Sequence, residues 1–327
     1  MVRVLSDEDV ASVLDLPALL PVVADAFEKQ RTGAIERPER PHYPIGVGLD
    51  PDAPAQPTGT GLCMPAYVHG ADYAATKLVT VCEDNPERGL PTVTAQLSLA
   101  DARTGQPVGY LAGTRVTNAR TGCIGGLAAR ELAVDEPIDL ALIGAGTQAR
   151  WQARAIAAAT DDVARIRVYS PSESREECAD DLAAELDVPA TAVESPREAV
   201  RDATVVVTAT TSTEPVFPGE ALEDGTLVVA VGAYTPEMRE LDAATIDRAA
   251  TVIADVPAEA AETGDLRDRP AREIQPLADA LAGRGGRESP ADVVVVASVG
   301  TAVLDAATAE FVFDRAAAND VGTTVSL

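Results

Sequence analysis

The chain has 327 residues, enough for two ordinary domains, and its 46% hydrophobic content is typical of a packed globular protein rather than a disordered one. Its 52 acidic and 26 basic residues give a formal net charge of −26, which repels phosphate backbones and excludes nucleic acid as an expected partner. No apolar stretch reaches the roughly 18 residues of a membrane-spanning helix, and the N-terminus MVRVLSDEDV lacks a signal peptide's layout. We therefore expect a cytoplasmic protein without a membrane partner.

The four cysteines are widely spaced and form no C-x-x-C pair, which is typical of reduced thiols and not of a disulfide framework or a zinc cluster. The two histidines, His42 and His69, lie in neither a G-x-S-x-G nor an H-E-x-x-H context. Triad hydrolysis and zinc catalysis therefore have no support from these residues. We expect no metal site, and surface positions for both histidines.

The first part of the chain predicts a mixture of helix and strand. Residues 6–32 have acids at their start and apolar residues at helical spacing, so they predict a helical start to the chain. The Pro- and Gly-rich stretch 37–61 predicts an irregular loop with short strands, and the apolar runs within 62–99 predict strands interrupted by a turn at 83–91. Residues 116–132 predict a helix that leads into the second domain.

From residue 138 the pattern changes to short apolar strands that alternate with helices. The predicted strands are IDLALIG, RIRVYS, TVVVTAT, TLVVAVG, TVIAD and DVVVVAS, and segments such as RWQARAIAAATDD and SREECADDLAAEL are helical in pattern. This alternation predicts a parallel sheet covered on both faces, the doubly wound Rossmann-type α/β arrangement. The tail GTAVLDAATAEFVFDRAAA predicts a helix that packs back on the first domain.

The segment IDLALIGAGTQARWQARAIAAA places a G-x-G-x-x-A pattern directly after a strand and directly before a helix. Gly144 permits the tight turn, Gly146 lets the backbone approach a pyrophosphate, and Ala149 stands where a third glycine usually allows helix and strand to pack closely. Free N–H groups at the helix start then face the phosphates. The alternative is an incidental glycine turn, but the strand–turn–helix context favours a dinucleotide site.

The choice between NAD and NADP depends on the end of the next strand, where NAD-specific sites usually place an acid. Here the strand ends in Ser170, Pro171 and Ser172, and Arg175 follows. Glu173 is near, but no acid stands directly at the tip. The pattern favours NADP(H), with NAD(H) as the alternative.

Lys29 and Lys77 are the only lysines in a chain whose other basic residues are arginines. Lys77, within YAATKLVTV, is either a strand lysine that points to solvent or, as we favour, a group retained because a lysine can donate a proton whereas an arginine stays charged. Arg40, in RPERPHYP, and Arg120, in TNARTGC, lie in unusually uncharged surroundings for this acidic chain, and a guanidinium binds a carboxylate in a bidentate fork. Each is either a structural arginine or a binder of an amino-acid or oxo-acid substrate.

The chain resembles the ornithine cyclodeaminase and mu-crystallin family over essentially its full length. The resemblance rests on CMPAY, TKLVTV followed by GLPTVTA, the RT of TNARTGC, LIGAGTQA, TSTEPV, AVGAYTPEMRELD and SVGTAVLDAATA, in that order. It implies a homodimer whose subunits have a discontinuous α+β domain, 1–125 and 300–327, for substrate binding and dimerisation, and a Rossmann dinucleotide-binding domain, 126–299. It also implies that Arg40, Lys77 and Arg120 bind the substrate carboxylate. The implied cofactor contacts, beyond Gly144 and Gly146, are Thr92, Arg120, Thr147, Gln148, Ser170, Thr210, Val231, Gly232, Ser298 and Val299.

Departures from the family pattern decide which activity we expect. Cyclodeaminases of the family resemble GGDxPGK where this chain has GAYTPEM, so Tyr234 replaces the catalytic aspartate and Met238 the lysine. Leu62 replaces a second expected acid. Because work on the substrate amino group needs a placed carboxylate, we predict an NAD(P)H-dependent reductase of cyclic imine or ketimine acids, such as Δ1-pyrroline-2-carboxylate, with Lys77 as the catalytic residue. Tyr234 either binds and orients the imine or packs.

Three alternatives stay open on the residues alone. A true ornithine cyclodeaminase requires a replacement carboxylate, for which Glu83, Asp84 and Asp305 are candidates. An alanine dehydrogenase-type enzyme would act on alanine, or on pyruvate and ammonia. The third is a non-catalytic binding protein regulated by a dinucleotide, since one branch of the family has a hormone-binding role.

The acidic composition generates a prediction about salt. Self-repulsion at a net charge of −26 destabilises a fold at low ionic strength, and screening relieves it, so we hypothesise a salt-adapted protein. The midpoint of thermal unfolding is expected to rise through a series of increasing KCl concentrations. A midpoint that stays flat or falls would contradict salt adaptation.

Overall fold

The computed structural model describes residues 1–267 and 269–326, apart from the side chain of Pro86. The chain forms two compact units. The first consists of Met1–Asp15, Asp25–Arg120 and the C-terminal segment from Thr301, and the second consists of Leu16–Ala24 and Thr121–Gly300. The units part near the domain boundaries that we predict, but the short segment Leu16–Ala24 groups with the second unit. The domain boundaries themselves stay a prediction.

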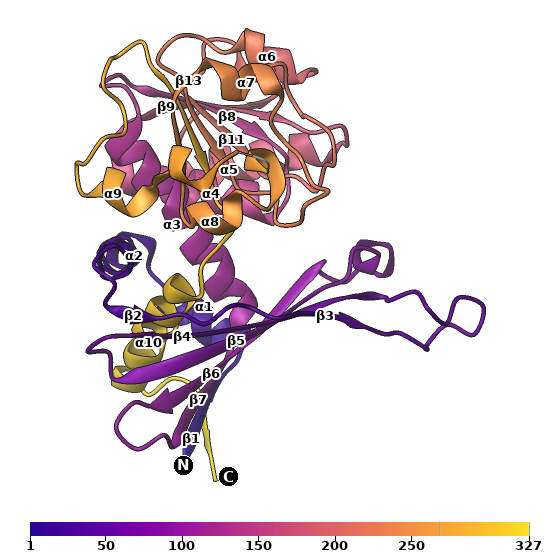
Figure 1. Ribbon diagram of the computed structural model, residues 1–327, viewed down its shortest axis with the longest axis vertical. Coiled ribbons are helices and arrows are strands. Elements are labelled where there is room, and N and C mark those ends of the chain that lie inside the picture. The colour runs from indigo at the N-terminus through magenta and orange to yellow at the C-terminus, as the bar shows by residue number, and fades with distance from the viewer. Residues whose placement is uncertain (268, 327) are drawn as a thin grey trace. The chain divides into compact units, whose positions relative to one another are not determined.

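The first unit contains a sheet of eight strands in the order β16-β1-β7-β6-β5-β4-β2, with β3 beside β4. Its pairings are antiparallel except for β1 with β7. Strands β1 and β16 pair with each other, so the two ends of the chain lie together (Figure 1). The strands are β1 Val2–Leu5, β2 Ile35–Glu36, β3 His42–Ile45, β4 Gly59–Val68, β5 Tyr73–Val81, β6 Val93–Asp101, β7 Pro107–Ala112 and β16 Thr323–Val325.

The central strands of this sheet have one buried face and one more open face. On the buried face, Met64 pairs with Lys77 and Lys77 with Leu97, and helix α10 (Ala302–Ala318) packs on β4 and β5. On the opposite face, Leu78 pairs with Gln96. Since side chains alternate along a strand, Lys77 belongs to the covered, otherwise apolar face. The predicted tail helix is thus confirmed, and it covers Lys77's side of the sheet.

The helical structure predicted for residues 6–32 is confirmed, and the structure divides it into two helices. Helix α1 (Asp7–Val13) begins with a capping box between Ser6 and Asp9 and ends at Leu14, whose backbone is extended. Helix α2 (Leu16–Arg31) follows with a proline in its first turn. Pro17 has no N–H with which to continue the hydrogen bonds of α1, but a proline is well tolerated in the first turn of a new helix. Helix α3 (Gly113–Leu132) confirms the helix predicted at 116–132.

The second unit is built on a parallel sheet of eight strands in the order β10-β9-β8-β11-β12-β15-β13-β14. All its recorded pairings are parallel, which confirms the doubly wound prediction. The chain order reverses at β8, which pairs with β9 on one side and β11 on the other; ligands bind at such a switch point. The strands are β8 Ile138–Ile143, β9 Val163–Tyr169, β10 Ala190–Ala192, β11 Val205–Thr208, β12 Leu227–Ala230, β13 Ala249–Ala254, β14 Gln275–Pro276 and β15 Val293–Ala297.

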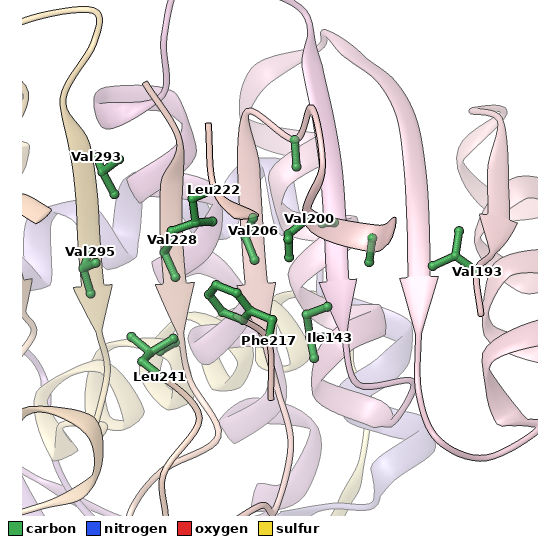
Figure 2. Packing of buried hydrophobic residues seen from close by; sticks show 14 residues of the cluster. Ile143, Val193, Val200, Val206, Phe217, Leu222, Val228, Leu241, Val293 and Val295 are labelled. Atoms are coloured by element: carbon green, nitrogen blue, oxygen red, sulfur yellow. The ribbon is translucent and has the colours of Figure 1, made fainter. Parts of the chain in front are cut away.

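Both faces of this sheet are buried, which explains why its strands are continuous apolar runs. On one face, Phe217, Leu222 and Leu241 pack on strand residues such as Val206 and Val228 (Figure 2). On the other, α4 packs on β8, β9 and β11. The helical segments of this unit are α4 Thr147–Thr160, α5 Ser174–Leu186, α6 Pro196–Val200, α7 Ala243–Arg248, α8 Pro257–Ala260 and α9 Leu277–Leu281, with short 3₁₀ turns at Gly219–Ala221, Gly264–Leu266 and Ala271–Glu273. A further 3₁₀ turn, Asn85–Arg88, lies between β5 and β6 of the first unit.

Within residues 1–267 and 269–326, no single helix has the length and apolar character to cross a membrane. The sharply bent pair α1 and α2 reaches the threshold only when the two are taken together, by length and composition.

Candidate active site

Three buried charged side chains meet in the first unit. Lys77 lies in the middle of β5 and is 2% exposed, and its Nζ is 2.6 Å from Oδ2 of Asp305 in the first turn of α10. Arg120 on α3 donates from Nε to the other oxygen of Asp305, at 2.9 Å. The alternative of a solvent-facing lysine is therefore wrong. Because a buried charge needs a partner, the Asp305 carboxylate allows both cations to lie inside the protein.

Burial and neighbouring charges set the protonation of these groups. Burial lowers the pKa of Lys77 from 10.5 to about 8, and the positive charges of Arg120 and Arg40 act in the same direction, while Asp305 opposes them. Burial would raise the pKa of Asp305, but Arg120 and Lys77 outweigh it and hold that pKa below its usual value. Asp305 is therefore a carboxylate, and Lys77 is a lysine that can exchange a proton near neutral pH.

Arg40 lies half-buried between β2 and β3, close enough for its charge to lower the pKa of Lys77. The structure thus brings together Arg40, Lys77 and Arg120, the three residues that the family resemblance implies for substrate binding. Lys77 and Arg120 share the Asp305 carboxylate, and Arg40 adds a positive charge close to Lys77, in a chain with a net charge of −26. A locally positive cluster of this kind is suited to a carboxylate ligand.

The glycine turn after β8 has the geometry of a dinucleotide cradle. Gly144 has φ +111°, and a Cβ there would lie 2.5 Å from the backbone oxygen of Ala209. A Cβ on Gly146 would meet no protein atom within 4 Å, so this position is open. Gly146 caps α4, which begins at Thr147, without a side-chain hydrogen bond. The first N–H groups of a helix suit an anion, so the turn fits a pyrophosphate.

A buried carboxylate, which sequence reasoning missed, joins the loops after β11 and β12. Glu240 accepts hydrogen bonds from the Thr208 hydroxyl at 2.9 Å, from Thr210 N–H at 2.7 Å and from Gly232 N–H at 2.8 Å. Burial, followed by the charge of Asp265, raises its pKa from 4.5 to about 7. Two of the predicted cofactor contacts, Thr210 and Gly232, are therefore fixed in place through their backbones by one side chain.

A second missed carboxylate, Asp255, holds the segment after β15. It accepts from the hydroxyl of Ser298 at 2.7 Å, from Val299 N–H at 3.1 Å and from Gly300 N–H at 2.8 Å. Asp255 is 1% exposed. Ser298 is predicted to contact the cofactor, but in this structure its hydroxyl donates a hydrogen bond to Asp255. No sequence signal singled out Glu240 or Asp255 among so many acids.

The tip of β9 carries three hydroxyl groups in a row. Ser170 and Ser172 are 3.2 Å apart between their Oγ atoms, and Ser172 and Ser174 are 2.6 Å apart. Arg175 donates to the backbone oxygen of Ser170 at 3.2 Å and pairs with Glu194 at 3.3 Å. The predicted cofactor residues Ser170, Ser172 and Arg175 therefore lie together, but the arginine already has an acidic partner.

The remaining candidates are placed as follows. Thr92 precedes β6 in the first unit; Gln148 lies in the first turn of α4, Val231 directly follows β12, and Tyr234 is half-buried in the loop after that strand. His42 is exposed in β3, and His69 is 3.1 Å from Glu36 at the surface. In the part of the chain that the structure describes, no group of three or more metal-ligating side chains is found.

Comparison with known proteins gives the family. The ornithine cyclodeaminase/mu-crystallin family matches residues 2–320. The chain is 37% identical over 324 residues, 96% of each chain, to the Δ1-pyrroline-2-carboxylate/Δ1-piperideine-2-carboxylate reductase of Azospirillum brasilense. The Thermococcus litoralis Δ1-pyrroline-2-carboxylate reductase, solved with NADH and L-proline, has a TM-score of 0.92 at 29% identity and covers 99% of this chain and 100% of its own. An archaeal alanine dehydrogenase dimer with bound NAD has a TM-score of 0.88 at 28% identity and covers 100% of this chain and 99% of its own. The chain belongs to the ornithine cyclodeaminase/mu-crystallin family.

Proposed function

We propose that the protein reduces the C=N bond of cyclic imine carboxylic acids, such as Δ1-pyrroline-2-carboxylate, with a nicotinamide dinucleotide as the reductant. The observation that carries the proposal is the buried cluster in which Lys77 and Arg120 share the Asp305 carboxylate and Arg40 adds a third positive charge. The similarity to the reductases of Azospirillum brasilense and Thermococcus litoralis supports the same reaction.

In the proposed mechanism, Arg120 and Arg40 bind the substrate carboxylate, because a guanidinium holds a carboxylate in a bidentate fork. Lys77 protonates the ring nitrogen, and its pKa of about 8 lets it give up a proton at neutral pH. The nicotinamide, when bound, supplies the hydride that the imine carbon accepts. The imine thus gains one hydride and one proton and becomes the ring amine of the product. Fixing the carboxylate also orients the C=N bond.

The ornithine cyclodeaminase alternative is less well supported by the structure. It needs a free carboxylate to act as a base on the amino group. The two oxygens of Asp305 lie at 2.6 and 2.9 Å from nitrogen atoms of Lys77 and Arg120, and its lowered pKa makes it a weak base. Glu83 and Asp84, the other candidates, are exposed residues beyond the end of β5.

We propose that the site takes both cofactors and prefers NADPH. The hydroxyls of Ser170, Ser172 and Ser174 stand where an NAD-specific site usually places an acid, and Arg175 lies beside them. The pairing of Arg175 with Glu194 reduces this preference. Use of NADH is supported by the relatives solved with NADH or NAD.

We also propose a cytoplasmic homodimer that pairs through the open face of the first sheet. The four free cysteines suit a reducing compartment, and the related archaeal alanine dehydrogenase is a dimer. The open face has no charged side chain among the central-strand residues described, although the chain's net charge is −26. It consists of Gly61, Cys63, Pro65, Thr76, Leu78, Thr80, Thr94, Gln96, Ser98, Tyr110 and Ala112. An uncharged face of this kind is typical of the centre of an interface.

An activity assay tests the proposed reaction. In KCl, the protein is expected to oxidise NADPH, and more slowly NADH, with Δ1-pyrroline-2-carboxylate and to form proline. The Lys77→Met variant should lose about 10²–10³-fold in kcat, the scale of one key electrostatic group, while Lys29→Met, at the only other lysine, should keep wild-type activity. Three results would overturn the proposal: ammonia release from ornithine with catalytic NAD, cofactor loss only with pyruvate and ammonia, or no turnover in any mixture.

Two glycine variants test the dinucleotide site. Gly146→Ala should keep the wild-type unfolding midpoint, because its Cβ meets no protein atom. It should weaken NADPH binding about tenfold or more, because the Cβ occupies space at the proposed pyrophosphate site, and tenfold is the scale of a lost charge-assisted hydrogen bond. Gly144→Ala should lower the free energy of unfolding by about 1–3 kcal/mol, because it forces a side chain into a positive φ. Calorimetry and thermal unfolding measure both. Unchanged cofactor affinity in a folded Gly146→Ala protein would exclude this turn as the pyrophosphate site.

A charged double variant tests the dimer face. Leu78 and Tyr110 are 38% and 42% exposed on the open face. Leu78→Glu with Tyr110→Glu should give a particle of one chain mass in sedimentation at high salt, whereas the wild type should have twice that mass. Thr191→Glu, on an exposed position of β10 in the second unit, is the matched control and should stay dimeric. A double variant that sediments as a dimer would mean that another surface joins the subunits.

A further inference from the structure

Asp305 is a buried carboxylate that contacts two cations of the candidate site. It lies in the first turn of α10 and is 1% exposed, and its two oxygens face Lys77 on β5 and Arg120 on α3. Arg40, from the segment between β2 and β3, adds its charge to the same cluster. The role of the carboxylate therefore lies in what it does to these two cations.

The first effect of Asp305 is on the charge of Lys77. Burial and the positive charges of Arg120 and Arg40 all favour the neutral amine, and Asp305 is the neighbouring group that favours the ammonium. At 2.6 Å, in surroundings that exclude water, that attraction is strong. The balance leaves the Lys77 pKa at about 8. Without the carboxylate, Lys77 would be largely neutral at neutral pH, and could neither attract a carboxylate ligand nor donate a proton.

The second effect is on the direction of Arg120. The hydrogen bond to Asp305 uses the Nε–H of the guanidinium. A guanidinium has five N–H donors in a fixed plane, so anchoring Nε fixes where the two terminal nitrogens point. A pre-oriented fork loses less conformational entropy when it binds a carboxylate than a freely rotating one.

We propose that Asp305 is a positioning residue for the reductase reaction, which keeps Lys77 in its charged form and orients the guanidinium of Arg120 toward the substrate carboxylate. This inference rests on the proposed function for its kinetic consequence, but not for its effect on Lys77 itself. Asp305 acts through Lys77 and Arg120, and it takes no part in proton or hydride transfer.

The first test observes Lys77 directly. Lysine labelled at the ε carbon should give two NMR signals, because Lys29 and Lys77 are the only lysines, and a Lys29→Arg variant assigns them. The Lys77 signal should titrate near pH 8 in the wild type. In Asp305→Asn its midpoint should fall by about 1–3 units, the range for loss of an adjacent opposite charge. Asp314→Asn is the matched control: Asp314 also lies on α10 and accepts a hydrogen bond from Tyr73 of β5. It should leave the signal unmoved.

The second test follows kcat/KM against pH with Δ1-pyrroline-2-carboxylate and NADPH. The loss of kcat/KM at alkaline pH should move to lower pH in Asp305→Asn by the same amount as the NMR midpoint, since kcat/KM reports groups of the free enzyme. At pH 8 the variant should therefore be about fivefold to several hundredfold below the wild type, and closer to it at pH 6. Asp305→Glu keeps the charge but displaces it, so it should lower kcat/KM with little movement of the pH profile.

The outcomes separate this inference from the proposed function. An unmoved Lys77 midpoint in folded Asp305→Asn would overturn the role of Asp305, and so would a midpoint that moves while the kinetic profile stays in place. If Asp305→Asn does not fold, Asp305→Glu provides the test. Either a wild-type kcat/KM in that variant, or a pH profile displaced to lower pH, would overturn the proposed role of Asp305. A wild-type protein that does not reduce the imine, but whose Lys77 midpoint depends on Asp305, would contradict the proposed function alone.

Discussion

The ion pairs between one carboxylate and two cations are the interaction on which the first unit depends. Lys77 belongs to a sheet face that is otherwise apolar and covered by α10, a place where an unpaired ammonium would be very costly. Asp305 makes that position tolerable, but only if α10 is held against β4 and β5. The antiparallel pairing of β16 with β1, just beyond the helix, anchors the end of the chain to the same sheet. The carboxylate partner that Lys77 needs is thus held in place by contacts between segments that are far apart in the sequence.

The second unit uses buried carboxylates in a similar way, with backbone N–H groups in place of cations. Glu240 joins the loops after β11 and β12, and Asp255 holds the segment after β15. Loops at the carboxyl ends of parallel strands must be irregular to receive a ligand, so their backbone groups lack the partners that a helix or sheet supplies. A single carboxylate accepts several of those N–H groups and keeps the loop in one conformation. Ser298 is an example. Its hydroxyl already donates a hydrogen bond to Asp255, so any contact of this hydroxyl with the cofactor would have to exist beside that bond.

Much of the second unit could be predicted from sequence because both faces of its sheet are buried, which makes each strand a short apolar run between helices. The predicted helix SREECADDLAAEL coincides with α5, and the glycine turn lies where the pattern places it. The first unit was harder, since β1, β7 and β16 are short strands that exist through their tertiary pairing. Lys77 stood out because lysine is rare in this chain. Asp305 is only one of three candidate carboxylates for a cyclodeaminase on the sequence alone. Glu240 and Asp255 did not stand out, because among 52 acidic residues no pattern distinguishes a buried carboxylate from an exposed one.

The same abundance of acid explains why the site cluster must be buried. Exposed charges interact over roughly 8–10 Å at moderate ionic strength and are screened further as salt rises. A protein that relies on salt to relieve its surface repulsion would therefore weaken any exposed cation that it used to attract an anionic substrate. Lys77, Arg120 and Asp305 are 2%, 5% and 1% exposed, so screening reaches them far less than the surface acids. Burial thus allows one chain to combine a strongly acidic sequence with a buried cluster of positive charges that salt screens little.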